Sequence, residues 1–276
     1  MLVTLREVLK DAQKNHYGVW LFNTVNLEMA KGVLAAAEAL KSPVIIGTAE
    51  VLLPYASLEE LAYFLLPMAK KASVPVVLHF DHGLTEPKIM EALRLGFSSI
   101  MYDCSTDSYE NNIGRVAQMV RIANLFGASV EGELGHVGDN VADDDGSIYT
   151  QPAQALDFVN RTGVDALAVA IGTANGAYKS KPRLDIGRLA EIAHTVPTPL
   201  VLHGGSGLSD EDFRNCVANG IAKINIFTDI NCAASRAAHD LYREGCGLTD
   251  LQNGIAEAVQ QETMKKMRIF GSAGRG

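Results

Sequence analysis

The sequence predicts an α/β fold in which eight strand–helix units close into a (β/α)8 TIM barrel, with an additional helix ahead of the first strand. Three observations predict it. Short apolar runs rich in β-branched residues recur along the chain, and a segment with helical periodicity follows each of them. The runs are continuously apolar, which is typical of strands buried on both faces of a parallel sheet. Eight such units fit within the 276 residues.

The elements follow in a regular order. The opening MLVTLREVLKDAQKN is expected to be a helix, because Leu5, Val8 and Leu9 fall on one face. Helices between the strands include LEMAKGVLAAAEALK, EPKIMEALRLG and NIGRVAQMVRIANLFG, and several end at a glycine suited to a left-handed cap. The eight strands are expected at VWLFN (19–23), PVIIGT (43–48), PVVLHF (75–80), SSIMYD (98–103), SVEGEL (129–134), ALAVAIG (166–172), PLVLHG (199–204) and KINIFT (223–228).

A doubly wound open sheet is the alternative architecture. It would usually have fewer strands, and the chain lacks a GxGxxG motif that opens a helix after the first strand. No internal repeat, low-complexity segment or linker interrupts the pattern. We therefore expect a single domain over residues 1–276.

Composition excludes several classes of protein. The net charge is −8, and the basic residues are spread along the chain without runs, so no nucleic-acid partner is expected. The apolar runs are far shorter than the roughly 20 residues that cross a bilayer, and the start does not resemble a secretory signal. The four cysteines show no CxxC spacing. These features predict a cytoplasmic protein with reduced thiols and no membrane partner.

Polar side chains gather at the C-terminal ends of the predicted strands, where a barrel of this kind holds its chemistry. Asp81 and His82 end the third strand and His203 ends the seventh. Any one of them could equally cap a strand or satisfy a loop. Two histidines and a carboxylate at one rim, however, are the ligands that suit zinc or a similar divalent ion. The other polar residues at strand ends are Asn23, His79, Asp103, Glu131 and Glu133.

The run HGGSG (203–207) predicts an anion site after the seventh strand. Successive glycines let backbone N–H groups approach an anion, and the Ser206 hydroxyl adds a donor. Barrels often hold phosphate in the loops after strands seven and eight, and Thr228 ends the eighth strand. Glycine turns are common, so the motif gains its specificity from this position.

Six of these segments also occur in the order of a known motif series. In sequence, LHFDHG, MYDCS, VEGELGHVG, AIGTANGAY, LHGGSG and INIFTD resemble the motifs of the class II, metal-dependent fructose/tagatose-bisphosphate aldolases. The resemblance covers nearly the whole chain and is closer to the tagatose-bisphosphate type, whose C-terminal helix resembles the closing KMRIFGSAG. It implies a barrel that binds one Zn2+ per subunit, cleaves a ketose 1-phosphate between C3 and C4 to dihydroxyacetone phosphate and an aldehyde, and forms a homodimer or homotetramer.

The resemblance also implies roles for individual residues. Asp81 would exchange a proton with the hydroxyl at the aldehyde carbon, and His82 and His203 would bind the metal. Asp103 and Glu133 would lie at an alternate or supporting metal position. A monovalent cation near the phosphate is also implied. The residues expected to bind the substrate and its phosphate are Asn23, Gly176, Gly204, Ser206, Asn225 and Thr228.

The expected chemistry agrees with these residue types. Carbon–carbon cleavage leaves an enediolate on the phosphate-bearing fragment, and a divalent ion can stabilise that charge as a Lewis acid. A lysine Schiff base is the other route. The only lysine at an end of a predicted strand is Lys223, at the N-terminal end of the eighth. The sequence therefore favours the metal route.

Two positions depart from the family pattern. The third metal ligand is usually a histidine in a GTAHG-like motif, but here it is Asn175, whose amide oxygen is a poorer ligand. Asn175 could bind weakly, Glu133 or His136 could replace it, or metal binding could be impaired; we expect it to be retained but weakened. The loop after Glu133 reads GDNVADDDG where GGxE is usual, so Asp143–Asp145 are candidate bases at C3 or form a solvated loop.

Two further questions stay open at this stage. A non-catalytic barrel that binds a sugar phosphate is the alternative function. The far end of the sugar is also not fixed, because the candidates for binding a second phosphate are only Lys179, Lys181, Arg183 and Arg268. A neutral, carboxylate or phosphate end is therefore compatible with the sequence. His79 is expected to hydrogen-bond to its neighbours rather than to bind the metal.

Overall fold

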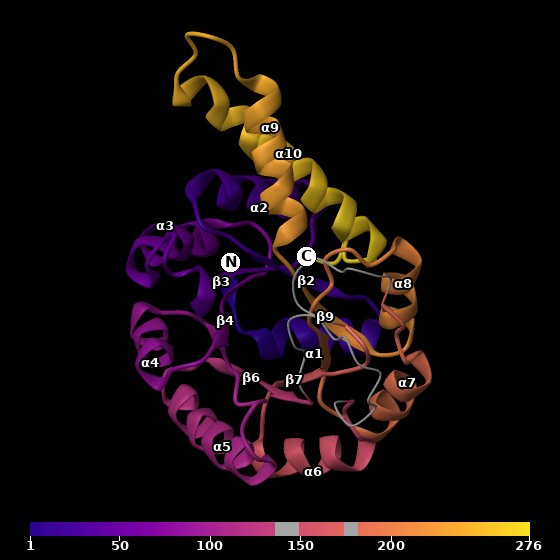
Figure 1. The fold of residues 1–276 in the computed structure, drawn as a ribbon. Coiled ribbons are helices and arrows are strands. Elements are labelled where there is room, and N and C mark those ends of the chain that lie inside the picture. Colours follow the sequence, from indigo (N-terminus) through magenta and orange to yellow (C-terminus); the bar gives the residue numbers. More distant parts are fainter. Residues whose placement is uncertain (136–148, 174–181) are drawn as a thin grey trace.

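The computed structural model describes residues 1–135, 149–173 and 182–276 (Figure 1). Its parallel strands β2 to β9 form a closed barrel, since β2 pairs with both β3 and β9 and β4 pairs with both β3 and β5. The predicted (β/α)8 barrel is confirmed, and each predicted apolar run overlaps one strand. The strands are β2 (Val19–Asn23), β3 (Val44–Ala49), β4 (Val76–Gly83), β5 (Ser99–Tyr102), β6 (Ser129–Leu134), β7 (Ala166–Val169), β8 (Leu200–Leu202) and β9 (Ile221–Ile226).

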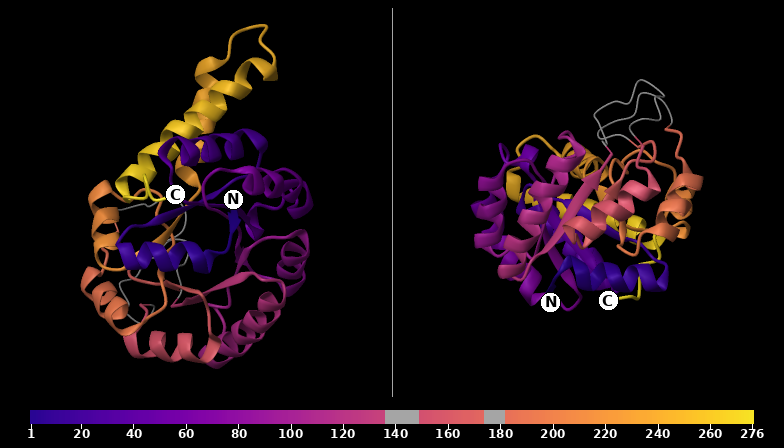
Figure 2. Two further views of the ribbon diagram at one scale, coloured as in Figure 1. Left: turned by 180° about the vertical axis from the view of Figure 1, so that it is seen from behind. Right: turned by 90° about the horizontal axis from the view of Figure 1, so that it is seen from below.

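Helices surround the barrel, and their ends carry the expected local signals (Figure 2). The Ser209 hydroxyl accepts a hydrogen bond from the Asp212 backbone and caps α8. No helix of the described residues is long and apolar enough to cross a membrane. The helices are α1 (Leu5–Asn15), α2 (Leu27–Leu40), the 3-10 helix η1 (Glu50–Leu52), α3 (Leu58–Lys71), α4 (Glu86–Leu95), α5 (Tyr109–Leu125), α6 (Pro152–Thr162), α7 (Ile186–Thr195), α8 (Asp210–Ala218), α9 (Thr228–Leu241) and α10 (Leu248–Ile269).

The N-terminal end of the barrel is closed by α1, the helix predicted ahead of the first barrel strand. Its residues Leu5 and Leu9 are fully buried and pack with Leu21 and Ile45 inside the barrel. Both chain termini lie at this end (Figure 2). A two-residue strand, β1 (Leu2–Val3), pairs with β4 and was not predicted, because so short a strand gives no periodic signal. With this end filled by apolar side chains, the opposite end is left for chemistry.

The main hydrophobic core lies between the barrel and its surrounding helices. Above the α1 plug, the barrel interior becomes polar, with His79, Glu131 and Lys223 fully buried. At the C-terminus, α9 and α10 form a hairpin that extends away from the barrel (Figure 1). Its inner half packs against α2, so the hairpin is anchored to the barrel beside β2.

Candidate active site

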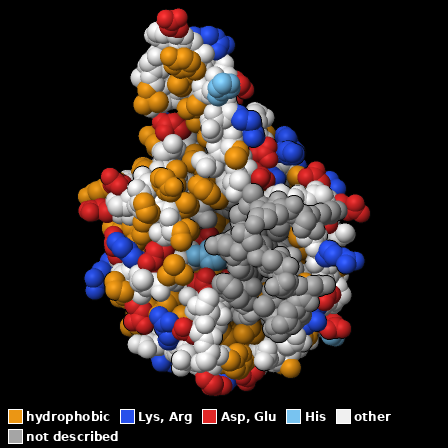
Figure 3. Space-filling view, in the orientation of Figure 1, with side chains coloured by type: hydrophobic (Ala, Val, Ile, Leu, Met, Phe, Trp, Pro, Cys, Tyr) orange, Lys and Arg blue, Asp and Glu red, His pale blue; other side chains and the backbone are white. Residues whose placement is uncertain are grey.

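A pocket of about 470 Å3 opens at the C-terminal ends of the strands. A histidine is visible at its mouth, in the centre of the barrel (Figure 3). The pocket brings together nearly every predicted site residue that the structure describes; Glu133 is buried behind it. The predicted site residues that line it are Asn23, Asp81, His82, Asp103, His203, Gly204, Ser206, Asn225 and Thr228. His136, Asp143–Asp145, Asn175, Gly176, Lys179 and Lys181 lie outside the described residues.

An irregularity in β4 places two consecutive residues in this pocket. The register with β5 shifts between Phe80 and Gly83, and His82 has a backbone φ of 40°. Neighbouring residues of a regular strand point to opposite faces, whereas a bulge re-aims one of them. Both Asp81 and His82 therefore line the pocket. A left-handed conformation at a residue other than glycine costs about 1–3 kcal/mol, and such strain is common at functional sites.

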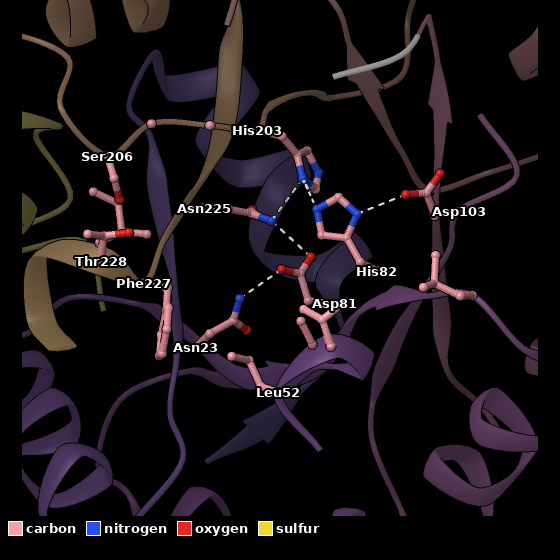
Figure 4. A pocket seen from close by; sticks show the side chains of 16 residues that line it. Asn23, Leu52, Asp81, His82, Asp103, His203, Ser206, Asn225, Phe227 and Thr228 are labelled. Atoms are coloured by element: carbon pink, nitrogen blue, oxygen red, sulfur yellow. Dashed lines mark hydrogen bonds and ion pairs between the residues drawn. The ribbon is translucent and has the colours of Figure 1, made fainter. Parts of the chain in front are cut away.

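Two amides hold the Asp81 carboxylate. The Asn23 side chain donates to Oδ2 at 2.8 Å and the Asn225 side chain donates to Oδ1 at 2.8 Å (Figure 4). Burial alone would raise the pKa of Asp81, but His82, His79 and Lys223 outweigh it and hold the pKa well below its usual value. Asp81 is thus an ionised carboxylate with a fixed orientation.

The rings of His82 and His203 meet nearly at right angles, with Nε2 of His82 2.7 Å from Nδ1 of His203 (Figure 4). Each ring is held by a carboxylate at its other nitrogen. Nδ1 of His82 lies 2.9 Å from Asp103, and Nε2 of His203 lies 2.8 Å from Glu131. Carboxylate partners of this kind fix the tautomer and orientation of metal-binding histidines. The facing nitrogens contact each other, and Nδ1 of His203 also lies 3.2 Å from the side-chain nitrogen of Asn225, so an ion shared by the two rings would replace these contacts.

These residues suit a divalent cation. One ligand atom each from Asp81, His82 and His203 lie within 4.8 Å of one another, and imidazole with carboxylate oxygen is a typical zinc environment. Burial opposes a charge on His82, yet Asp81, Asp103 and Glu133 raise its pKa to about 10. Burial and the nearby His82 lower the pKa of His203. The carboxylates around the two rings therefore favour one positive charge here, carried by His82 or by a metal ion.

An adjacent position could hold a cation as well. His82, Asp103 and Glu133 also offer ligand atoms within 4.8 Å of one another. Glu133 is 1% exposed. Asp103 and Glu133 thus lie next to the first group and share His82 with it.

A buried layer beneath the pocket was not found from the sequence. The Lys223 ammonium group lies 2.7 Å from Oε2 of Glu131, whose other oxygen holds His203. Both residues are fully buried. His79 lies beside them, with Nδ1 2.8 Å from the Ser99 hydroxyl and Nε2 3.7 Å from Asp81. Alternation along SVEGEL and KINIF would have shown that Glu131 and Lys223 point inward with Glu133 and Asn225.

The expected place of Lys223 is wrong in one respect. Strand β9 begins at Ile221, two residues before its predicted start, so Lys223 is the third residue of the strand. Its side chain lies inside the barrel below the site, paired with Glu131. It does not line the pocket, so a substrate bound there would not reach its amino group, and a Schiff base at Lys223 stays disfavoured.

The HGGSG loop forms the other corner of the pocket, beside β9. Gly204 and Gly207 have φ values of 69° and 92°, which favour glycine. A Cβ atom at Gly205 would lie 2.8 Å from Ile224, so the loop can pack this closely only with glycine there. The loop thereby places Ser206 next to Thr228, the first residue of α9 (Figure 4). Hydroxyl groups and the N-terminus of a helix meet here, as in many phosphate sites.

Comparisons with known proteins agree with this geometry. The family model described as fructose-bisphosphate aldolase class-II matches residues 3–275. The chain is 40% identical over 278 residues to the uncharacterized protein YdjI of Escherichia coli K12, covering 100% of this chain and 99% of YdjI. It is 38% identical over 305 residues to the fructose-bisphosphate aldolase of Thermus caldophilus, with 100% of both chains covered.

Solved structures give the same result. The crystal structure of the YdjI aldolase from Escherichia coli K12 superimposes with a TM-score of 0.91 at 39% identity, over 100% of this chain and 99% of that one. A putative fructose-1,6-biphosphate aldolase from Coccidioides immitis gives a TM-score of 0.90 at 29% identity, over 98% and 97%. Barrel, pocket and whole-length similarity together show that the chain belongs to the class II fructose-bisphosphate aldolases, a family of metal-dependent lyases.

Proposed function

We propose that the protein cleaves or forms the C3–C4 bond of a ketose 1-phosphate, with dihydroxyacetone phosphate and an aldehyde as the other side of the reaction. The observation that carries this proposal is that Asp81 shares one pocket with the two histidines and with the HGGSG loop. His82 and His203 offer ligand atoms within 4.8 Å of it, and the HGGSG loop lines the same pocket. One small sugar phosphate can therefore reach a metal ion, a carboxylate and an anion site at once.

The described residues fit a bound Zn2+. His82 and His203 would hold it, with Asp103 and Glu133 as alternate ligands, and each facing ring already has a carboxylate partner. When bound, the ion would supply positive charge that stabilises the enediolate left on the phosphate-bearing fragment. Asn175 lies outside the described residues, so weakened metal binding is proposed from the sequence alone.

The chain's own groups would bind the substrate and move its proton. Asp81 would accept the hydroxyl proton at the aldehyde carbon during cleavage and return it during condensation, in an orientation fixed by Asn23 and Asn225. The Oδ1 atoms of those two amides are buried with no hydrogen-bond partner among the described residues, which leaves two unsatisfied acceptors beside Asp81. Ser206 and Thr228 would hold the 1-phosphate.

The remaining roles are proposed from the sequence. Gly204 and Gly176 would contribute to the phosphate site, with a monovalent cation nearby, and a carboxylate among Asp143–Asp145 would exchange the proton at C3. We also propose that residues 1–276 act as one domain in a cytoplasmic homodimer or homotetramer without nucleic-acid or membrane partners. A non-catalytic sugar-phosphate-binding barrel is the alternative, favoured only by Asn175 in place of the usual histidine.

Incubation with ketose 1-phosphates tests the proposal. Zinc-supplemented protein is expected to release dihydroxyacetone phosphate, measured by its coupled reduction with NADH. Chelation should abolish the release and added Zn2+ should restore it, because the metal supplies the charge stabilisation. Binding of ketose 1-phosphates without any release in the presence of Zn2+ would instead support the non-catalytic barrel.

Replacing Glu131 with glutamine is expected to weaken Zn2+ binding by about 10- to 100-fold, since loss of a carboxylate partner disturbs a metal-binding histidine by this much. Glu131 holds Nε2 of His203 at 2.8 Å. The measurement is a competition titration against a chromophoric chelator. The matched control is Glu91→Gln, because Glu91 pairs with Lys88 on the outer face of α4. Equal affinities for the two variants would show that Glu131 does not support the metal site.

A further inference from the structure

One wall of the pocket is apolar. It consists of Ala49, Val51, Leu52, Leu84 and Phe227. Val51 is 64% exposed and Leu84 is 46% exposed, which is unusual for large aliphatic side chains that line a site. Figure 3 shows apolar side chains beside the histidine at the mouth of the barrel. Such surface gains free energy when an apolar or uncharged part of a ligand covers it.

The wall is held in place by Glu50. Its Oε2 atom accepts from the backbone N–H groups of Leu84 at 2.7 Å and Thr85 at 3.0 Å, and its Oε1 atom accepts from the Thr85 hydroxyl at 2.7 Å. These bonds join η1, which carries Val51 and Leu52, to the loop between β4 and α4. The apolar side chains are therefore fixed before a substrate arrives.

The position of the wall shows which end of a substrate it would meet. In the barrel, β2 separates β3 and β4 from β9 and β8. Leu52 lies on the side of Asn23 and Asp81, away from Ser206 and Thr228 (Figure 4). A ketose with its 1-phosphate at Ser206 and its reacting carbons at Asp81 would direct its remaining carbons toward Leu52.

The described side chains of the wall offer no positive charge to neutralise an anion. Among the described residues that line the pocket, none is lysine or arginine. Of the four candidates for binding a second phosphate, Arg183 and Arg268 do not line it, and Lys179 and Lys181 lie outside the described residues. The carboxylate of Glu50 lies behind the wall instead. Among the described residues, a phosphate or carboxylate at the far end of the sugar would lose water here without gaining a cationic partner.

Building on the aldolase function above, we propose that the preferred substrate is a ketose 1-phosphate whose far end is uncharged. The aldehyde that it releases carries neither phosphate nor carboxylate. Val51, Leu52 and Leu84 determine this preference by packing against the terminal carbons of the aldehyde fragment.

The test compares ketohexose 1-phosphates that differ only at C6. The zinc-supplemented protein is given fructose and tagatose 1-phosphates whose C6 is a hydroxymethyl, methyl, phosphorylated hydroxymethyl or carboxylate group. Release of dihydroxyacetone phosphate is followed. The uncharged forms are expected to have kcat/KM at least about tenfold higher than the charged forms, because an anion there is left unpaired. Equal or higher values for a phosphate or carboxylate would overturn this preference and leave the aldolase function standing. No release from any of them would overturn both.

A variant tests the location of the preference. Val51→Lys adds a cation at an exposed position and is expected to shift the ratio of kcat/KM values about fivefold toward the C6 phosphate, as one added charge pair near water would. Val51→Gln, similar in length but uncharged, should keep the ratio of the unmodified protein. An unchanged ratio in Val51→Lys would show that the far end of the substrate does not reach this wall.

Discussion

An Asp81→Asn variant is expected to cleave its ketose 1-phosphate about 10³-fold more slowly than the unmodified protein, which is a typical contribution of a positioned proton-transfer group. The carboxylate is 1% exposed and held at both oxygens by amides, which do not exchange protons in its place. An asparagine has nearly the same shape and can still accept a hydrogen bond from Asn23 or Asn225. The loss should therefore appear in kcat, measured by release of dihydroxyacetone phosphate under saturating substrate.

The same variant should keep its metal and its affinity for phosphate. His82 and His203, which would hold the ion, and the HGGSG loop, which would bind the phosphate, are unchanged. Zinc content and the affinity for dihydroxyacetone phosphate are the readouts that separate lost chemistry from lost structure. Asp157→Asn, an exposed position on α6, is the matched control and should retain full activity. A fall of less than about tenfold in Asp81→Asn would exclude Asp81 as the proton-transfer residue.

A Lys223→Met variant is expected to lower the free energy of unfolding by about 3–5 kcal/mol, because it leaves a buried carboxylate without its partner. Lys223 and Glu131 are 0% exposed and 2.7 Å apart inside the barrel. The melting temperature should fall by roughly 10 °C for a chain of this size. Urea and thermal unfolding of the metal-free proteins would measure both quantities.

Two comparisons sharpen this experiment. Adding Glu131→Gln to Lys223→Met should recover part of the loss, since the unpaired charge is then gone. Lys88→Met removes the exposed pair with Glu91 and should cost less than about 1 kcal/mol. A similar small cost for Lys223→Met would show that the buried pair contributes little.

The stability that Lys223 provides should also depend on pH. Although burial would raise the pKa of Glu131, Lys223 and His203 lower it from 4.5 to about 2. The folded state therefore holds the ionised form, and the stabilisation is complete above pH 4.5 and lost as the pH falls toward 2. The difference between the unmodified protein and Lys223→Met should narrow over that interval.

The fold could be predicted because each strand carries its own signal. The runs at PVVLHF and PLVLHG were found from composition alone, and the polar residues that follow them meet in one pocket since parallel strands end at the same rim. The resemblance to class II aldolases is confirmed by the family match, while the tagatose-bisphosphate type and the roles of individual residues stay predictions.

The parts that were missed depend on distant contacts. Lys223 and Glu131 are 92 positions apart in the sequence, so no local pattern relates them. The bulge in β4 arises from its pairing with β5, whereas the sequence of β4 alone suggests that Asp81 and His82 point to opposite faces. The apolar wall also went unnoticed, because Val51 and Leu84 come from two connections that Glu50 brings together.

The left-handed backbone at His82 makes every substitution there ambiguous. Glycine and asparagine adopt such a φ of 40° with little penalty, whereas alanine bears the same penalty as histidine. A substitution that relieves the backbone strain at this position thus removes the imidazole on which the reaction would depend. Selection for expression yield and selection for turnover would pull residue 82 in opposite directions, so a variant that accumulates well is no guide to one that works.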